Sequence, residues 1–123
     1  MRPESLTYLE DILWYAADAL EISHGRSFER YIKDKEFRYA IERCFEVIGE
    51  ALTKINKIDP SVAQTMTEWR KIIGFRNVLI HGYDQIDDAI TWRILTEKLP
   101  ALLNEARKLF MEGGGSSDDL PPI

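Results

Sequence analysis

The side chains best suited to chemistry in this chain lie close together, within residues 74–84. Arg76, Asn77, His81 and Tyr83 supply a guanidinium, an amide, an imidazole and a phenol. Arginine is a planar, permanently charged donor that suits phosphate, and histidine gives or takes a proton near neutral pH. This combination predicts a reaction at a phosphodiester that needs no metal ion or other cofactor.

The chemistry that fits these groups is internal transesterification of RNA. The ribose 2′-hydroxyl attacks the adjacent phosphate, while a base removes its proton and an acid protonates the leaving 5′-oxygen. We expect Arg76 to stabilise the negative charge that builds on the phosphorane, because preorganised charge contributes strongly to catalysis. We expect His81 to transfer a proton and Asn77 to position a phosphate oxygen or the imidazole.

One histidine does not readily serve both proton transfers, and His24 has no motif around it. If the helix continues through His81, the imidazole is rotated well away from Arg76, whereas a helix that ends at residues 80–82 releases it. A symmetric dimer brings two copies of this pair to one cleft, because a two-fold interface presents the same patch from both chains. We therefore predict that dimerisation forms the active site.

Ordinary structural roles stay open for several of these side chains. Arg76 can pair with carboxylates of a neighbouring helix, and Asn77 can be a cap or an interhelical contact. Glu50, earlier in the chain, either supports Arg76 or makes an ordinary ion pair. His81 and Asp84 are three residues apart, but no third or fourth ligand lies near them in the sequence, so we predict no metal site.

The first half of the chain predicts two helices. Apolar residues recur every three or four positions over residues 5–21, with Ser5 as the N-cap. A longer apolar seam over residues 35–57 steps by four and three, which predicts lengthwise packing against other helices. Asp59 and Pro60 end this second helix.

The second half predicts three more helices, the first of which carries the candidate residues. That helix begins near Ser61 or Thr67 and ends at Gly82. Another spans residues 87–98, and the last begins at Pro100, which suits the first turn of a helix. No alternating strand pattern occurs. The fold class that we predict is an all-α, up-and-down bundle of about five helices.

Composition indicates one globular domain. Hydrophobic residues make up 45% of the 123 residues and charged residues 30%, and a chain of this length forms a single core. We expect the helical domain in residues 1–111 and a flexible acidic tail rich in Gly, Ser and Pro in residues 112–123. There is no membrane-length apolar run, no signal-peptide core and only one cysteine, Cys44, so we expect a cytoplasmic protein.

The formal net charge of −5 argues against indiscriminate binding of nucleic acid, because non-specific affinity comes mainly from neutralised phosphates. The excess of negative charge lies at the two ends of the chain: residues 1–21 sum to −4 and residues 112–123 to −3, so residues 22–111 sum to +2. A local basic surface stays possible, because basic side chains cluster in one region: Arg26, Arg30, Lys33, Lys35, Arg38 and Arg43.

The pattern Arg-Asn-x-Leu-x-His-x-Tyr, which begins at Arg76, resembles the signature of the HepT-like ribonuclease toxins of the HEPN superfamily. Residues 48–51 and 68–75 also look like that family's second helix and its approach to the motif. The likeness covers about residues 5–110. One departure is that Glu68 precedes Trp69 where the family pattern suggests a proline.

The resemblance implies a HEPN-like homodimer that acts as a metal-independent endoribonuclease toxin on tRNA or mRNA. Arg76 and His81 would then be the catalytic residues, with Asn77 and possible support from Glu50. It also implies a type VII-like toxin–antitoxin pair, in which an MntA-type minimal nucleotidyltransferase neutralises the toxin by transferring AMP to Tyr83.

Two other interpretations stay open at this stage. One is a non-catalytic helical subunit that binds a nucleotide or a partner nucleotidyltransferase, since Arg76 and His81 also suit a nucleotide phosphate. The other is a structural dimerising bundle without a ligand. That second interpretation explains the apolar seam over residues 35–57 but not the polar cluster of residues 74–84.

Overall fold

The structure is a computed structural model that describes residues 1–122, among which every regular element is helical. The prediction of an all-α fold is confirmed. No helix in this part of the chain combines the length and the apolar character needed to cross a membrane. In chain order the elements are α1 (Pro3–Ser23), α2 (Phe28–Lys33), α3 (Lys35–Ile58), α4 (Pro60–Ala63), α5 (Trp69–His81), η1 (Tyr83–Gln85), α6 (Asp88–Arg93), η2 (Ile94–Lys98), α7 (Leu99–Glu112) and η3 (Ser117–Asp119).

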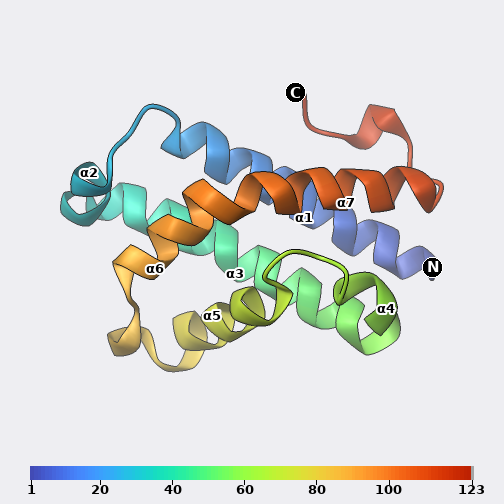
Figure 1. Ribbon diagram of the computed structural model, residues 1–123, viewed down its shortest axis with the longest axis horizontal. Coiled ribbons are helices and arrows are strands. Elements are labelled where there is room, and N and C mark those ends of the chain that lie inside the picture. Colours follow the sequence, from blue (N-terminus) through green and yellow to red (C-terminus); the bar gives the residue numbers. More distant parts are fainter. Residues whose placement is uncertain (123) are drawn as a thin grey trace.

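The long helices run in alternating directions, as Figure 1 shows. Helix α1 packs against both α3 and α7, and α3 packs against both α1 and α5. α3 therefore lies inside the bundle, with α5 on the side that faces away from α7. Residues 88–112 form one nearly continuous helical path, in which η2 is a π-helical turn between α6 and α7.

The apolar seam of α3 lies in the core, as its spacing predicts. Ile41, Ile48 and Ile55 are fully buried, and the seam packs with apolar residues of α1 and α7 in one hydrophobic cluster. Burial of one such side chain contributes about 1.5–3 kcal/mol. This repeated burial fixes the rotation of α3 about its axis, and with it the direction of the polar residues on the same helix.

Ser5 is not the N-cap of α1, contrary to the prediction. Helix α1 begins at Pro3, whose fixed φ suits the first helical position, so Arg2 is the N-cap. The Ser5 hydroxyl instead donates to Asp59 Oδ2 at 2.6 Å, and the Arg2 backbone N–H donates to the same oxygen at 2.8 Å. The start of α1 is thereby tied to the end of α3.

The helix predicted to begin near Ser61 or Thr67 is α5, which begins at Trp69, close to the second of these positions. Residues Pro60–Ala63 form the separate short helix α4. Glu68, the residue before α5, has a left-handed backbone with φ 59°. The Glu105 carboxylate on α7 holds this corner, because it accepts the Thr67 N–H at 2.7 Å and the Thr67 hydroxyl at 2.6 Å. These long-range contacts turn the chain so that α5 runs back along α3.

The segment after α7 lies against the bundle. The Trp14 indole N–H donates to the Asp119 carbonyl at 2.9 Å, and Arg107 donates to the Pro121 carbonyl at 3.4 Å. Leu120 is partly buried against the hydrophobic cluster. The segment that the sequence predicts as a flexible tail therefore makes specific contacts, which place it over α1 and α7.

Helices α3 and α5 approach each other very closely at Gly49. A Cβ placed there would lie 2.4 Å from the Cβ of Arg76 and 3.1 Å from the Ile72 carbonyl oxygen. Real Cβ atoms do not tolerate such contacts, because close-packed interiors have no room to yield. Because Gly49 has no side chain, Arg76 can lie directly on α3.

We predict that Gly49→Ala lowers the free energy of unfolding by about 1–3 kcal/mol, because the added methyl group overlaps Arg76. Gly74→Ala on α5 is the matched control, since a Cβ there meets nothing within 4 Å. It should raise the free energy of unfolding by about 0.5–1 kcal/mol through helix propensity. Urea unfolding followed by circular dichroism measures both, and equal effects would contradict the close crossing.

Candidate active site

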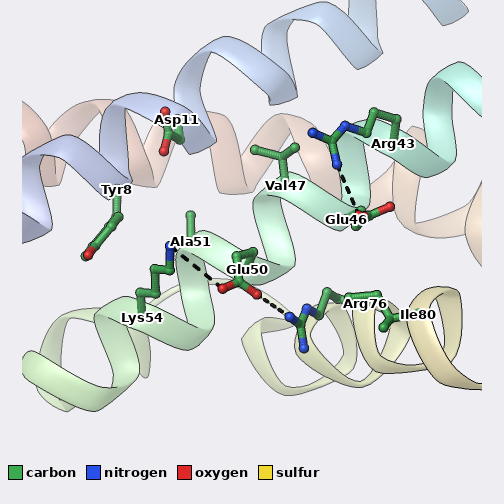
Figure 2. Close-up of a pocket in the computed structure, with 10 residues that line it drawn as sticks. All are labelled: Tyr8, Asp11, Arg43, Glu46, Val47, Glu50, Ala51, Lys54, Arg76 and Ile80. Atoms are coloured by element: carbon green, nitrogen blue, oxygen red, sulfur yellow. Dashed lines mark hydrogen bonds and ion pairs between the residues drawn. The ribbon is translucent and has the colours of Figure 1, made fainter.

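Arg76 lies on the face of α5 that meets α3. Its Nη2 donates to Glu50 Oε2, and its Nη1 donates to Asn77 Oδ1 at 3.0 Å; Figure 2 shows the first of these bonds. The Nε atom is buried and has no hydrogen-bond partner in residues 1–122. A guanidinium has five N–H donors, so two contacts leave part of its capacity for a ligand. The side chain is 22% exposed.

Glu50 bridges two cations on the surface of α3. One carboxylate oxygen accepts from Arg76, and the other lies 3.8 Å from Lys54 Nζ, one turn further along α3. Partly exposed pairs of this kind contribute at most about 1 kcal/mol to stability. The bridge matters more for direction, because it holds the Arg76 guanidinium against α3.

A cavity of about 260 Å³ opens beside Arg76, between α1, α3 and α5 (Figure 2). Its size is just below the range of small-molecule sites, which suits a phosphate with part of a nucleotide. Each basic group in it has a carboxylate partner: Arg43 pairs with Glu46 at 3.1 Å, and Glu50 serves the other two. The lining residues are Tyr8, Asp11, Arg43, Glu46, Val47, Glu50, Ala51, Lys54, Arg76 and Ile80.

His81 is the last residue of α5 and is exposed. α5 ends within residues 80–82, where an end was expected to release the imidazole, but His81 itself still belongs to the helix. The five-residue step from Arg76 therefore turns the imidazole by about 140° around the helix axis. Ile80 lines the cavity beside Arg76, and His81 does not. Within one chain the structure therefore brings Asn77 and Glu50 to Arg76 and leaves His81 on another side of α5.

Tyr83 lies in η1, directly after α5, and its hydroxyl donates to Glu42 Oε1 at 2.8 Å. The two residues differ sharply in burial, since Tyr83 is 52% exposed and Glu42 is 7% exposed. The hydrogen bond to Glu42, with desolvation and the carboxylate's charge, raises the pKa of Tyr83 to about 12. Burial in turn raises the pKa of Glu42, against the lowering effect of the Tyr83 hydrogen bond.

A second cavity of about 210 Å³ lies beside Tyr83. It shares Arg43 and Glu46 with the cavity beside Arg76. The two cavities are therefore neighbours, and a group attached to the Tyr83 hydroxyl would lie close to the surroundings of Arg76. The residues that line the second cavity are Tyr39, Glu42, Arg43, Glu46, Leu79 and Tyr83.

Glu42 is not among the candidate functional residues that the sequence predicts. A signal is nevertheless present, because Glu42, Phe45, Gly49 and Leu52 follow each other at steps of three and four along one row of α3. The other three are buried and apolar or small. A carboxylate in such a row requires a polar partner, which proves to be the Tyr83 hydroxyl.

We predict that the Tyr83 phenol titrates near pH 12 in the wild type and that Glu42→Gln shifts its pKa toward the ordinary value of 10.0. Glutamine still accepts the hydrogen bond but carries no charge. The titration is followed by NMR of ¹³C-labelled tyrosine rings, with Tyr83→Phe for assignment and Glu36→Gln as the control on α3. A Tyr83 pKa that is unchanged in Glu42→Gln would show that the two groups do not interact.

The sequence matches the family model described as "Ribonuclease HepT-like" over residues 12–109. Similar curated proteins include "Putative RNase MJ1380" of Methanocaldococcus jannaschii, which is 37% identical over 80% of this chain and 89% of its own length. "Probable ribonuclease HepT" of Thermococcus cleftensis is 31% identical over 89% of this chain and 98% of its own length. No solved structure matches. The chain therefore belongs to the HepT-like ribonuclease family, and ribonuclease is the enzyme class that this family assigns to it.

Proposed function

We propose that this protein is a cytoplasmic endoribonuclease toxin of a type VII-like toxin–antitoxin pair, acting on tRNA or mRNA without a metal ion. Membership of the HepT-like ribonuclease family supports the reaction class. The position of Arg76 supports a reaction at a phosphate. Its guanidinium is held by Glu50 and Asn77 at the edge of a cavity that is large enough for a phosphate with part of a nucleotide.

In the proposed reaction Arg76 binds the scissile phosphate and stabilises the phosphorane. Its two hydrogen bonds fix the direction of the guanidinium before RNA binds. A charge that is already oriented stabilises the transition state most effectively, because it does not have to reorganise during the reaction. Asn77 and Glu50 act through Arg76 as positioning residues. His81 moves the proton of the 2′-hydroxyl or of the leaving 5′-oxygen.

The rotation of α5 supports a dimer in the proposed mechanism. Because Arg76 and His81 of one chain point about 140° apart, a single chain does not direct both at one phosphate. A two-fold axis beside α5 brings the His81 of a second copy toward the first copy's Arg76. Ile80, which is 42% exposed at the rim of the cavity, supplies apolar surface for that contact.

Tyr83 is the proposed site of neutralisation by AMP transfer from an MntA-type nucleotidyltransferase. Its ring is half exposed, and its cavity adjoins the one beside Arg76 through Arg43 and Glu46. An AMP group on the Tyr83 hydroxyl adds bulk and a negative charge there. Both effects oppose the binding of an RNA phosphate at Arg76.

We predict that the purified protein cleaves RNA in the presence of EDTA and that Arg76→Ala and His81→Ala each lower the rate by about 10²-fold or more. Arg70→Ala and His24→Ala are the matched controls, because both residues are exposed and lie outside the two cavities. Cleavage of a labelled RNA is measured on gels, with circular dichroism to confirm that each variant is folded.

The same assay tests the dimer and the alternative function. Full cleavage by the Arg76 or His81 variant would contradict the assigned roles. Full activity of a chain that sediments as a monomer at the assay concentration would contradict the shared cleft. Tight nucleotide binding without RNA cleavage would indicate the non-catalytic binding subunit instead.

We predict that co-expression with a cognate MntA-type nucleotidyltransferase increases the mass of the protein by one or more AMP units. Tandem mass spectrometry should place the added mass on Tyr83, and Tyr83→Phe should abolish it. Tyr39 is the natural comparison, because it lines the same cavity and is 50% exposed. Added mass on Tyr39 would refute the assignment.

A further inference from the structure

Transfer of AMP to Tyr83 requires a group that removes the phenol's proton. The surroundings of Tyr83 raise its pKa to about 12, so only a minute fraction of the side chain is ionised at neutral pH. A nucleophile of this kind needs a base within hydrogen-bond distance when it attacks.

Glu42 already occupies the position of that base. Its Oε1 lies 2.8 Å from the Tyr83 hydroxyl and accepts its proton in a hydrogen bond. The carboxylate is almost completely buried on α3, which makes it more basic than a surface carboxylate. Arg38 on α3 and Asp88 on α6 are the other charges that act on it, and they do so with opposite signs.

Tyr39 shows why this contact matters. It is as exposed as Tyr83 and lines the same cavity, so a partner enzyme has access to both rings. Within residues 1–122, however, Tyr83 is the tyrosine whose hydroxyl donates to a carboxylate. The proton acceptor, rather than exposure, therefore distinguishes the two phenols.

Building on the proposed neutralisation by AMP transfer, we propose that Glu42 is the catalytic proton acceptor for the modification of Tyr83. The Tyr83 oxygen attacks the α-phosphorus of ATP, and a new oxygen–phosphorus bond forms as the bond to the β-phosphate bridging oxygen breaks. Pyrophosphate leaves with that electron pair. The phenol's proton passes to Glu42 and then to solvent, so the toxin supplies the base for its own modification.

The cavity beside Tyr83 is consistent with this step. It provides about 210 Å³ next to the attacking oxygen, with Arg43 in its wall. Arg43 is exposed and pairs with Glu46 in the unmodified protein, so it can turn toward the new phosphodiester. The same position lets the attached AMP reach the cavity of Arg76.

The test compares Glu42→Gln with the wild type in a time course of AMP incorporation. The reaction contains the full chain, a cognate MntA-type nucleotidyltransferase, ATP and Mg²⁺, and mass spectrometry follows the product on Tyr83. Glutamine keeps the size and the hydrogen-bond acceptor but takes up no proton, so the rate should fall by about 10²-fold or more. Glu36→Gln, on the exposed start of α3, should leave the rate unchanged.

A ring-fluorinated tyrosine at position 83 separates proton acceptance from positioning. Its phenol is more acidic and depends less on a base, so it should restore most of the rate lost in Glu42→Gln. If Glu42 only positions the ring, fluorination gives no such rescue, and the proposal is wrong.

The remaining outcomes are also decisive. Equal rates for Glu42→Gln and the wild type would overturn the role of Glu42 and leave Tyr83 as the modified residue. No AMP on the wild type would overturn the proposed neutralisation itself. If Glu42→Gln does not fold, the pH–rate profile of AMP incorporation is compared between the chain with tyrosine and the chain with fluorotyrosine at position 83. If Glu42 accepts the proton, the midpoint of the profile is the same for both. If the phenol ionises directly, the midpoint shifts with fluorination and the proposal is wrong.

Discussion

The candidate site depends on the close contact between α3 and α5 at Gly49. Because residue 49 has no side chain, the base of Arg76 lies directly on α3, within reach of the Glu50 carboxylate on the next residue. A larger residue at this crossing would push α5 away from α3. The hydrogen bond to Glu50 and the wall of the cavity depend on that same short distance, so one glycine links the packing of the bundle to the orientation of its most important cation.

Helix α3 provides an acidic partner for two of the four motif side chains. Glu50 binds Arg76, and Glu42, two turns earlier and about 12 Å away along the axis, binds Tyr83. Their surroundings give them different effects. Glu50 is partly exposed and shared with Lys54, so it orients a cation. Glu42 is buried, which raises its own pKa, and its hydrogen bond with the Tyr83 hydroxyl raises the pKa of that phenol.

Paired charges also reconcile an acidic chain with a reaction at phosphate. The cations of the cavity beside Arg76 are held by carboxylates within the same cavity. Such a surface has little long-range attraction for nucleic acid, since attraction of that kind requires unneutralised positive charge. Recognition then depends on short-range contacts with a correctly placed phosphate. Control by a nucleotide on Tyr83 fits the same arrangement, because the two neighbouring cavities share Arg43 and Glu46.

The sequence by itself determined the helical class, the central place of α3 and the grouping of Arg76 with Asn77, because helical periodicity and neighbour spacing are local properties. The family pattern marked His81 and Tyr83 in the same way. Only the tertiary structure decided the hydrogen-bond partners. The Ser5 hydroxyl donates to Asp59, the Glu105 carboxylate holds the turn before α5 at Thr67, and the Tyr83 hydroxyl donates to Glu42. These contacts join residues between 38 and 54 positions apart. No local pattern encodes these contacts. They form only after several helices have buried their apolar faces together, because that packing sets how the helices are rotated against each other.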